Sequence, residues 1–149
     1  MAQFGVYAPP ARSVLLLDMQ ADLLDPLNTR VGGQQAMTLH LSAVGAAELR
    51  RGAAILPDGR RRDRLLAAID AMIAEDFAGR VLPFDSAAAM AFAAIFTGRR
   101  NAGRPISFPD CQIATTARAH GAAMATRNVA DFDGCGVEAI DPWAHTGGT

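Results

Sequence analysis

The chain has 149 residues, of which 50% are hydrophobic and 19% are charged, and its formal net charge is −1. This length suits one domain of about 100 to 200 residues, and the apolar content excludes a disordered chain. No apolar run approaches the roughly 20 residues that cross a bilayer, and the first 13 residues lack the order of a secretory signal. We therefore expect one folded domain in the cytoplasm, with no membrane contact.

The small net charge excludes nucleic-acid binding by bulk electrostatics, so any contact with a polyanion must be local. Cys111 and Cys135 have neither a CxxC nor a His-paired zinc spacing, and we treat them as small apolar residues. The three histidines are scattered, and the chain has no GxxxxGK or GxGxxG motif. These absences disfavour covalent hydrolases and nucleotide-driven enzymes.

The chain begins with two predicted strands and a helix. The short apolar run Val14–Leu17 predicts a buried strand that ends at Asp18, and Leu39–Leu41 is a weaker strand candidate. Ser42 is a suitable N-cap for a helix over 43–56, which the following Pro-Asp-Gly turn closes.

The middle of the chain predicts two amphipathic helices around a short strand. Apolar residues from Arg64 onward repeat with helical spacing, and Gly79 follows the last turn. Val81–Phe84 predicts a strand. Asp85 can then cap a helix with apolar positions at Met90, Phe92, Ile95 and Phe96, which runs into a GRRNAGRP loop.

The last third has the clearest helix signals. Ser107 and Asp110 have the spacing of a capping box, and Gly121 stands where a C-terminal glycine cap belongs. The segments 122–125 and 137–140 are brief strand candidates, separated by the sequence TRNVADFDGCG.

Strands that alternate with helices favour a parallel sheet covered on both faces, an α/β sandwich. Ligands of such sheets lie beyond the carboxyl ends of the strands, where Asp18 and the TRNVADF segment occur. We assign residues 14–143 to this domain, 1–13 to an N-terminal extension and 144–149 to a flexible tail.

Acidic residues occur where this topology could bring them together. Asp18 follows the first strand, Glu48 lies in a helix, Asp110 is in a first helical turn, and Asn128 and Asp131 follow the fourth strand. Carboxylates around one pocket repel each other unless a cation neutralises them, and oxygen ligands select Mg²⁺ or Mn²⁺. Such an ion can activate water and shield a phosphodiester, which is nuclease chemistry.

Each acid also has a structural explanation, and for any one of them alone this explanation is favoured. Asp110 could complete the capping box, Glu48 could pair with Arg51, and Asp131 could cap a turn. The residues alone leave open whether the acids converge.

Three stretches together resemble one known family. They are LSAVGAAELRRGAAILPDGRRRDRL, GRVLPFDSAAA and GRPISFPDCQIATTARAHGAAMATRNVADFDGCGVEAIDPW, and they span Leu41 to Trp143 almost without interruption. In this order they are similar to the PIN-domain toxins called VapC. The resemblance implies a parallel, five-stranded α/β/α domain, usually a homodimer, that cleaves RNA with Mg²⁺ or Mn²⁺ and is held inactive by a VapB-type antitoxin.

The resemblance also implies roles for individual residues. Asp18, Glu48 and Asp110 match the family's catalytic, metal-binding acids. Asn128 falls where many relatives have a fourth acid, and nearby Asp131 is the carboxylate still available for catalysis and metal binding.

Substrate contacts are expected beside these acids. By the family's pattern Thr126 would orient its segment, and we assign Thr126 and Arg127 to substrate binding. The basic run Arg60–Arg62 with Arg64 could meet RNA phosphates or an acidic antitoxin segment, but a solvated helix entry is the favoured explanation.

The departures from the family lie near the front of the chain. Met19 and Gln20 follow Asp18 where relatives usually have Thr-Asn, and only thirty positions separate Asp18 from Glu48. Pro26–Met37 shows no clear helix where relatives have one. An altered N-terminal third is compatible with reduced activity.

Three hypotheses follow. The first is a metal-dependent endoribonuclease that is the toxin of a toxin–antitoxin pair. The second is a catalytically impaired PIN-fold protein that mainly binds its antitoxin, and the third is an α/β binding module whose acids serve only as helix caps.

Overall fold

The computed structural model describes residues 14–18 and 38–141 of the chain. Five strands in this part form one parallel sheet in the order β3-β2-β1-β4-β5. They are β1 (Val14–Leu17), β2 (Thr38–Ser42), β3 (Val81–Leu82), β4 (Ala123–Ala125) and β5 (Ala139–Ile140). The predicted parallel sheet is thus confirmed, with β1 at its centre.

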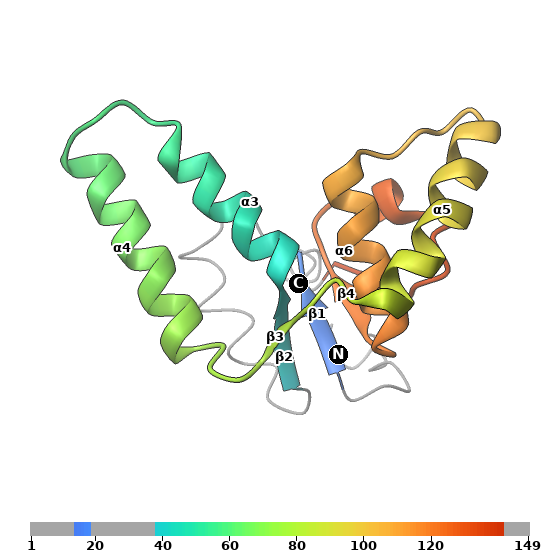
Figure 1. Cartoon of the computed structure of the whole chain (residues 1–149), viewed down its shortest axis with the longest axis horizontal. Helices are drawn as coiled ribbons and strands as arrows, with labels where there is room; N and C mark the ends of the chain where they lie inside the picture. Colours follow the sequence, from blue (N-terminus) through green and yellow to red (C-terminus); the bar gives the residue numbers. More distant parts are fainter. Residues whose placement is uncertain (1–13, 19–37, 142–149) are drawn as a thin grey trace, which may run out of the picture.

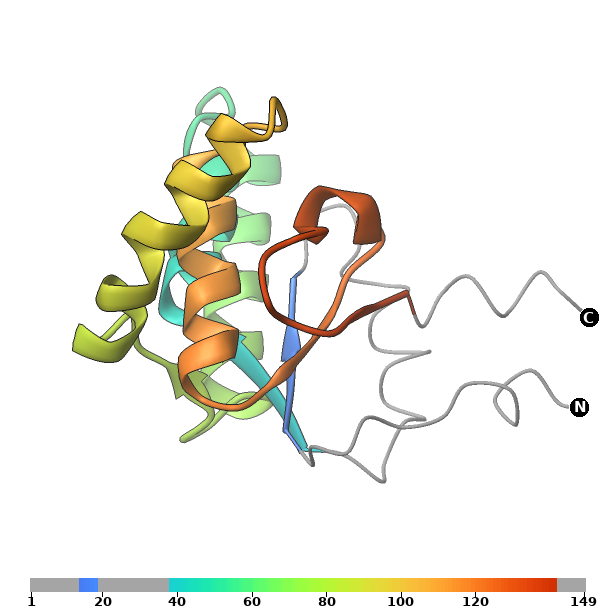
Figure 2. The same ribbon diagram turned by 90° about the vertical axis from the view of Figure 1, so that its right-hand side faces the viewer.

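The helices flank this sheet. They are α3 (Ala43–Ala54), α4 (Arg60–Glu75), α5 (Ser86–Asn101), α6 (Phe108–Ala119) and the short 3-10 helix η3 (Val129–Phe132). Figure 1 shows α3 and α4 on one side of the strands and α5 and α6 on the other. Figure 2 shows η3 and its loop beyond the end of β1. No helix among the described residues is long and apolar enough to span a membrane.

Each face of the sheet has its own core because successive side chains of a strand point to opposite faces. Leu15 and Leu17 pack with buried residues of α3 and α4, such as Leu49 and Ile69. Leu16 packs with the α5 and α6 residues on the other face. Burial of a leucine side chain contributes about 1.5 to 3 kcal/mol. The continuous apolar run of β1 is therefore explained by a three-layer α/β/α sandwich.

The helix caps predicted from neighbouring residues in the sequence are confirmed. The side-chain oxygens of Ser42, Asp85 and Ser107 accept backbone N–H groups at 2.7, 3.0 and 3.2 Å. Gly121 has a φ of +67° just after α6, a conformation that disfavours residues with a Cβ.

Several predicted boundaries were wrong by a few residues. Helix α3 ends two residues earlier than predicted, and β3 stops at Leu82 because Pro83 cannot donate a hydrogen bond to a strand ladder. Met90, expected among the apolar positions of α5, is 82% exposed.

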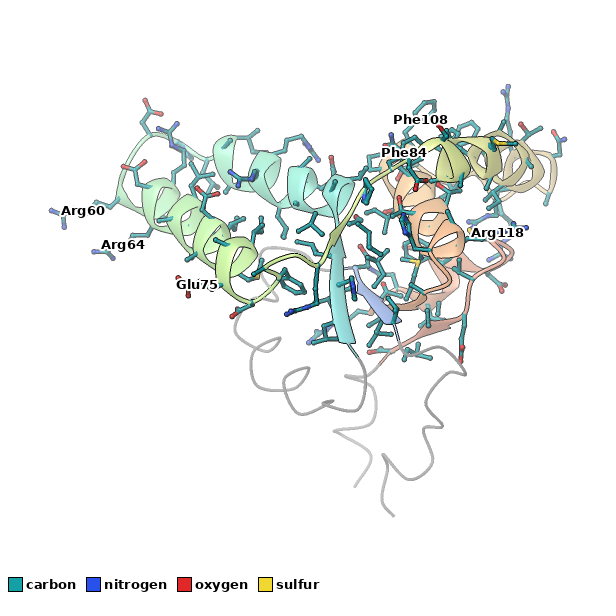
Figure 3. All side chains as sticks on the ribbon, turned by 60° about the horizontal axis from the view of Figure 1, so that its bottom comes forward. Arg60, Arg64, Glu75, Phe84, Phe108 and Arg118 are labelled. Atoms are coloured by element: carbon teal, nitrogen blue, oxygen red, sulfur yellow. The ribbon has the colours of Figure 1, made fainter. Side chains whose placement is uncertain are left out.

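Helix α4 begins at Arg60, so the basic run forms its first turn. Arg62 pairs with Asp58, whereas Arg60 and Arg64 extend away from the strands, as a solvated helix entry predicts (Figure 3).

Helix α5 continues through Asn101 and includes half of the segment predicted to be a loop. Gly98 costs about 1 kcal/mol in a helix, but Ile95 and Arg99 are buried on either side of it and hold the last turns in place. The proposed extension 1–13, the tail 144–149, Met19, Gln20 and Pro26–Met37 lie outside the described residues, so the domain boundaries stay predictions.

Candidate active site

The strand order reverses between β1 and β4, and this is the position where parallel sheets bind ligands. Asp18 follows β1 and Thr126 follows β4. The backbone N–H of Asp18 donates to the carbonyl of Ala125 at 2.9 Å, which brings the two strand ends together. The Thr126 hydroxyl donates to Asp18 Oδ2 at 2.9 Å and accepts the N–H of Asn128 at 3.0 Å. Thr126 therefore links Asp18 to the segment that follows β4.

Asp18 is the most perturbed acid of the site. Burial raises its pKa to about 6, the hydrogen bond from Thr126 opposes this rise, and the charges of Asp110 and Asp131 add to it. A carboxylate that is desolvated and faces other carboxylates is unfavourable until a cation compensates its charge.

Asp110 lies in the first turn of α6 behind its N-cap Ser107. Burial raises the pKa of Asp110, a hydrogen bond with the Ser107 side chain lowers it, and the charges of Asp131 and Glu48 raise it further. The positive charge of Arg99 acts in the opposite direction. Asp110 is therefore electrostatically coupled to acids from two other elements.

An aromatic group holds this end of α6 against α5. The Phe108 ring in the first turn of α6 makes edge contacts with Phe92 and Phe96 of α5, at centroid distances of 5.4 and 4.9 Å. Figure 3 shows Phe108 and Phe84 at this helix junction. Because Asp110 follows Phe108 by two residues, the aromatic contacts help to fix the position of its carboxylate.

Glu48 is paired with an arginine of its own helix. It projects from α3 with a side chain that is 35% exposed, and the Arg51 guanidinium donates to it at 3.1 and 3.4 Å. The hydrogen bond and charge of Glu48 raise the pKa of Arg51. The surface pair considered as a structural explanation is therefore present, although Glu48 also acts electrostatically on Asp110.

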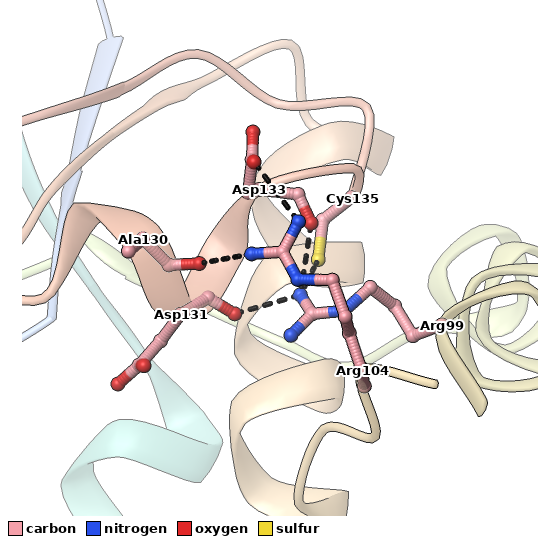
Figure 4. Close-up of polar contacts among 6 residues, drawn as sticks. All are labelled: Arg99, Arg104, Ala130, Asp131, Asp133 and Cys135. Carbon is pink, nitrogen blue, oxygen red and sulfur yellow. Dashed lines mark hydrogen bonds and ion pairs between the residues drawn. The ribbon is translucent and has the colours of Figure 1, made fainter. Parts of the chain in front are cut away.

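Asp131 lies on η3, and its backbone N–H donates to the Asn128 carbonyl at 2.9 Å. Its carboxylate is directed away from the nearby Arg99 guanidinium (Figure 4). Asn128 and Arg127 are exposed between Thr126 and η3. The segment after β4 thus brings its polar residues to the edge where β1 ends.

We define the acidic cluster as Asp18, Glu48, Asp110 and Asp131. Because Asp131 affects the pKa of both Asp18 and Asp110, and Glu48 affects that of Asp110, these acids form one electrostatic neighbourhood. This coupling disfavours the hypothesis that they are independent caps.

The acidic cluster has the donor atoms that a divalent metal ion requires. Within residues 14–18 and 38–141, no three His, Cys, Asp or Glu side chains lie close enough to hold one ion together. The donors are nevertheless all oxygens, and Mg²⁺ commonly binds one or two carboxylates while it keeps several waters. The donor chemistry and the repulsion within the cluster fit such an ion, and the full ligand set of Asp18, Glu48, Asp110, Asn128 and Asp131 stays a prediction.

The cysteines have no visible part in this chemistry. Cys111 and Cys135 are both free and buried, in agreement with their interpretation as apolar residues. Burial raises the pKa of the Cys111 thiol to about 11, so it is not a nucleophilic thiolate at neutral pH.

Arg99 is a residue near the site that the sequence reasoning missed. It is 8% exposed and reaches the loop that contains Asp131. The sequence did indicate that Arg99 is buried, because position 99 has helical spacing from Ala88, Phe92 and Ile95 and lies on the same inward face of α5. An arginine on a core face requires partners.

Comparisons with known proteins agree with this fold. The family model described as PIN domain matches residues 25–133. The VapC ribonuclease Y4jK of Sinorhizobium fredii is 39% identical over 113 residues, which cover 76% of this chain and 81% of that protein. Toxin FitB of Neisseria gonorrhoeae is 37% identical over 105 residues, with coverages of 70% and 76%.

A solved structure extends the likeness to three dimensions. The structure of FitAB bound to an IR36 DNA fragment matches with a TM-score of 0.72 and 33% identity, over 87% of this chain and 95% of that chain. The sheet order, the two helical layers and these matches agree with one another, and the chain belongs to the PIN-domain family, among the relatives of the VapC-type toxins.

Proposed function

We propose that this protein is a metal-dependent endoribonuclease that acts as the toxin of a toxin–antitoxin pair. The observation that supports this most is the acidic cluster at the β1–β4 switch point, where burial and then the charges of neighbouring acids raise the pKa of both Asp18 and Asp110. The relatives named VapC ribonuclease and toxin FitB support the same activity class.

Within this proposal, Asp18 and Asp110 bind Mg²⁺ or Mn²⁺, and Glu48, Asn128 and Asp131 complete the site directly or through water. The ion would supply an activated water and positive charge beside the phosphodiester. The chain's own residues prepare the ligands, since Thr126 holds Asp18 by a hydrogen bond of 2.9 Å and Ser107 caps the helix turn that contains Asp110.

The proposal also includes a substrate contact and protein partners. Arg127 is exposed beside Thr126, where a guanidinium can meet an RNA phosphate. The matching FitAB structure is bound to a DNA fragment, and we propose a VapB-type antitoxin as a partner of this chain. A homodimer and a cytoplasmic location belong to the same proposal.

The activity is tested with purified, antitoxin-free protein on a mixture of structured and single-stranded RNAs. We expect cleavage with Mg²⁺ or Mn²⁺, none with EDTA, and a loss on the order of 100-fold or more in Asp110→Asn, because a metal-binding carboxylate is removed. The matched control is Asp63→Asn, an exposed acid in the first turn of α4. Cleavage that persists in EDTA or in Asp110→Asn would contradict the proposal.

A second candidate is a PIN-fold protein that binds its antitoxin without catalysis. Two observations favour it, since no three metal-binding side chains are assembled among the described residues and Glu48 is engaged by Arg51. This candidate predicts a stable antitoxin complex, no cleavage under any metal condition and no stoichiometric Mn²⁺ binding. Stoichiometric Mn²⁺ binding by the wild-type protein would exclude it.

A further inference from the structure

The most unusual buried group outside the acidic cluster is the guanidinium of Arg99. It lies at the C-terminal end of α5, and it crosses to the segment between β4 and β5 (Figure 4). Its Nη1 donates to the carbonyls of Asp131 and Asp133 at 2.7 and 2.9 Å and contacts Cys135 Sγ at 3.4 Å. Its Nε donates to the carbonyl of Arg104 at 2.7 Å.

A second arginine contacts the same segment from outside. Arg104 Nη1 is 3.1 Å from the Asp133 carboxylate, and its Nη2 donates to the Ala130 carbonyl at 3.3 Å. The Arg104 side chain is half-exposed, so this pair is screened by water and contributes little. We call Arg99 and Arg104 together the arginine clamp, with Arg99 as its buried member.

The acceptors of Arg99 explain why a charge is retained in the core. Among the described residues they are three backbone carbonyls and a thiol, and none is a carboxylate. A buried guanidinium is costly unless it is hydrogen-bonded, and an apolar side chain would satisfy the packing of α5 equally well. Arg99 therefore connects the end of α5 to the segment between β4 and β5 through the carbonyls of Asp131 and Asp133.

Apart from the arginine clamp, few contacts with distant residues hold the segment 128–135 in place. Its own backbone hydrogen bonds, from the N–H groups of Asp131, Asp133 and Cys135, span only three residues each. The buried ring of Phe132 is its main apolar anchor. The bonds from Arg99 connect residues 32 and 34 positions apart, so they tie the loop to α5.

We propose that Arg99 is a positioning residue of the acidic cluster, which acts by holding the backbone of Asp131 so that its carboxylate faces Asp18 and Asp110. The guanidinium binds the Asp131 carbonyl and leaves the carboxylate directed away from it, and therefore available (Figure 4). This inference rests on the proposed metal-dependent activity and assigns to Arg99 no contact with substrate or metal.

The test compares Arg99→Met and Arg99→Lys with two controls, Arg104→Met and Arg100→Met. Arg100 is the exposed neighbour of Arg99 in the same helical turn. Three quantities are measured: amide hydrogen exchange over residues 129–136, Mn²⁺ affinity by calorimetry, and kcat and KM for RNA cleavage.

In Arg99→Met we expect faster exchange in this segment and a Mn²⁺ affinity about 10- to 100-fold weaker, the range for residues that support metal ligands. We also expect kcat to fall with little change in KM. Arg99→Lys should recover part of each loss, because an ammonium can replace the Nη1 contacts but not the Nε contact. Arg104→Met should change each quantity less than Arg99→Met, and Arg100→Met should not differ from wild type.

The outcomes separate this inference from the proposed function. A wild-type protein that binds no Mn²⁺ and cuts no RNA would refute the proposed function, and the positioning role with it. An active wild type with unchanged Mn²⁺ affinity and kcat in Arg99→Met would overturn the positioning role alone. If Arg99→Met does not fold, Arg99→Lys decides: a weaker Mn²⁺ affinity together with faster exchange over residues 129–136 supports the role, and a weaker affinity without faster exchange there overturns it.

Discussion

Two hydrogen-bonded acids of this protein lie in different surroundings. Asp18 is half-buried at the end of the central strand β1 and accepts from Thr126, whereas Glu48 projects from α3 and accepts from the exposed Arg51 of the same helix. The pKa of Asp18 is raised to about 6 although its partner stabilises the charged form, because burial has the larger effect. Desolvation thus outweighs the hydrogen-bond partner at Asp18.

The difference has a direct consequence for stability. The folded-state pKa of Asp18 lies above its usual value of 3.8, so its protonated form favours the fold. That contribution is complete below pH 3.8 and is lost as the pH rises through about 6. At neutral pH the ionised Asp18 therefore destabilises the metal-free protein, as expected where activity requires an unfavourable group.

The largest effect is expected from Asp18→Asn. In metal-free buffer at pH 7.5 this change should raise the free energy of unfolding by up to about 3 kcal/mol, which corresponds to the pKa shift from 3.8 to about 6. Asparagine keeps an oxygen that can accept the Thr126 hydroxyl. Urea unfolding at pH 7.5 and pH 4 provides the measurement.

The gain should shrink strongly at pH 4, where the wild-type carboxyl is largely protonated. Asp63→Asn, an exposed acid on α4, serves as the control and should show no such pH-dependent gain. Equal effects of the two variants, or a loss of stability in Asp18→Asn at pH 7.5, would show that burial does not dominate at Asp18.

A smaller effect is expected from Thr126→Val. This change removes the donor to Asp18 and the acceptor for the Asn128 N–H, and it should lower the free energy of unfolding by about 1.5 kcal/mol at pH 7.5. The loss should be smaller at pH 4, since the hydrogen bond stabilises the ionised carboxylate. Thr126→Ser keeps the hydroxyl, so a similar loss in both variants would point to packing rather than to the hydrogen bond.

The smallest effect is expected from Arg51→Met, which breaks the surface pair with Glu48. Exposed ion pairs contribute little because water screens them, and we expect the melting temperature to stay within experimental error. Thermal unfolding at low and high salt is the measurement. A clear, salt-sensitive drop would show that the Glu48–Arg51 pair supports α3, and the contrast with Asp18 would disappear.

The elements with local signals could be predicted from sequence. Ser42, Asp85 and Ser107 each cap the helix that follows, because an N-cap bonds a residue only three positions ahead. The strand at 14–17 was also clear from its apolar run. These local features alone place Asp18 and Asp110 at the ends of elements.

The features that sequence did not show depend on distant residues. The last turn of α5 was predicted as a loop because Gly98 and the following arginines are typical of loops. Burial of Arg99 holds this turn, and two of the carbonyls that accept from Arg99 lie more than 30 residues further along the chain. The raised pKa values of Asp18 and Asp110 likewise depend on burial among elements that the sequence places far apart.

The most direct test of the acidic cluster is a calorimetric Mn²⁺ titration of the wild-type protein, Asp18→Asn and Asp110→Asn. Asp18→Asn is informative because it should be more stable than wild type, so lost binding could not be attributed to unfolding. We predict stoichiometric binding by the wild type, which weakens below the Asp18 pKa of about 6, and strongly reduced binding by both variants. Equal binding by all three proteins, or none by the wild type, would contradict the account.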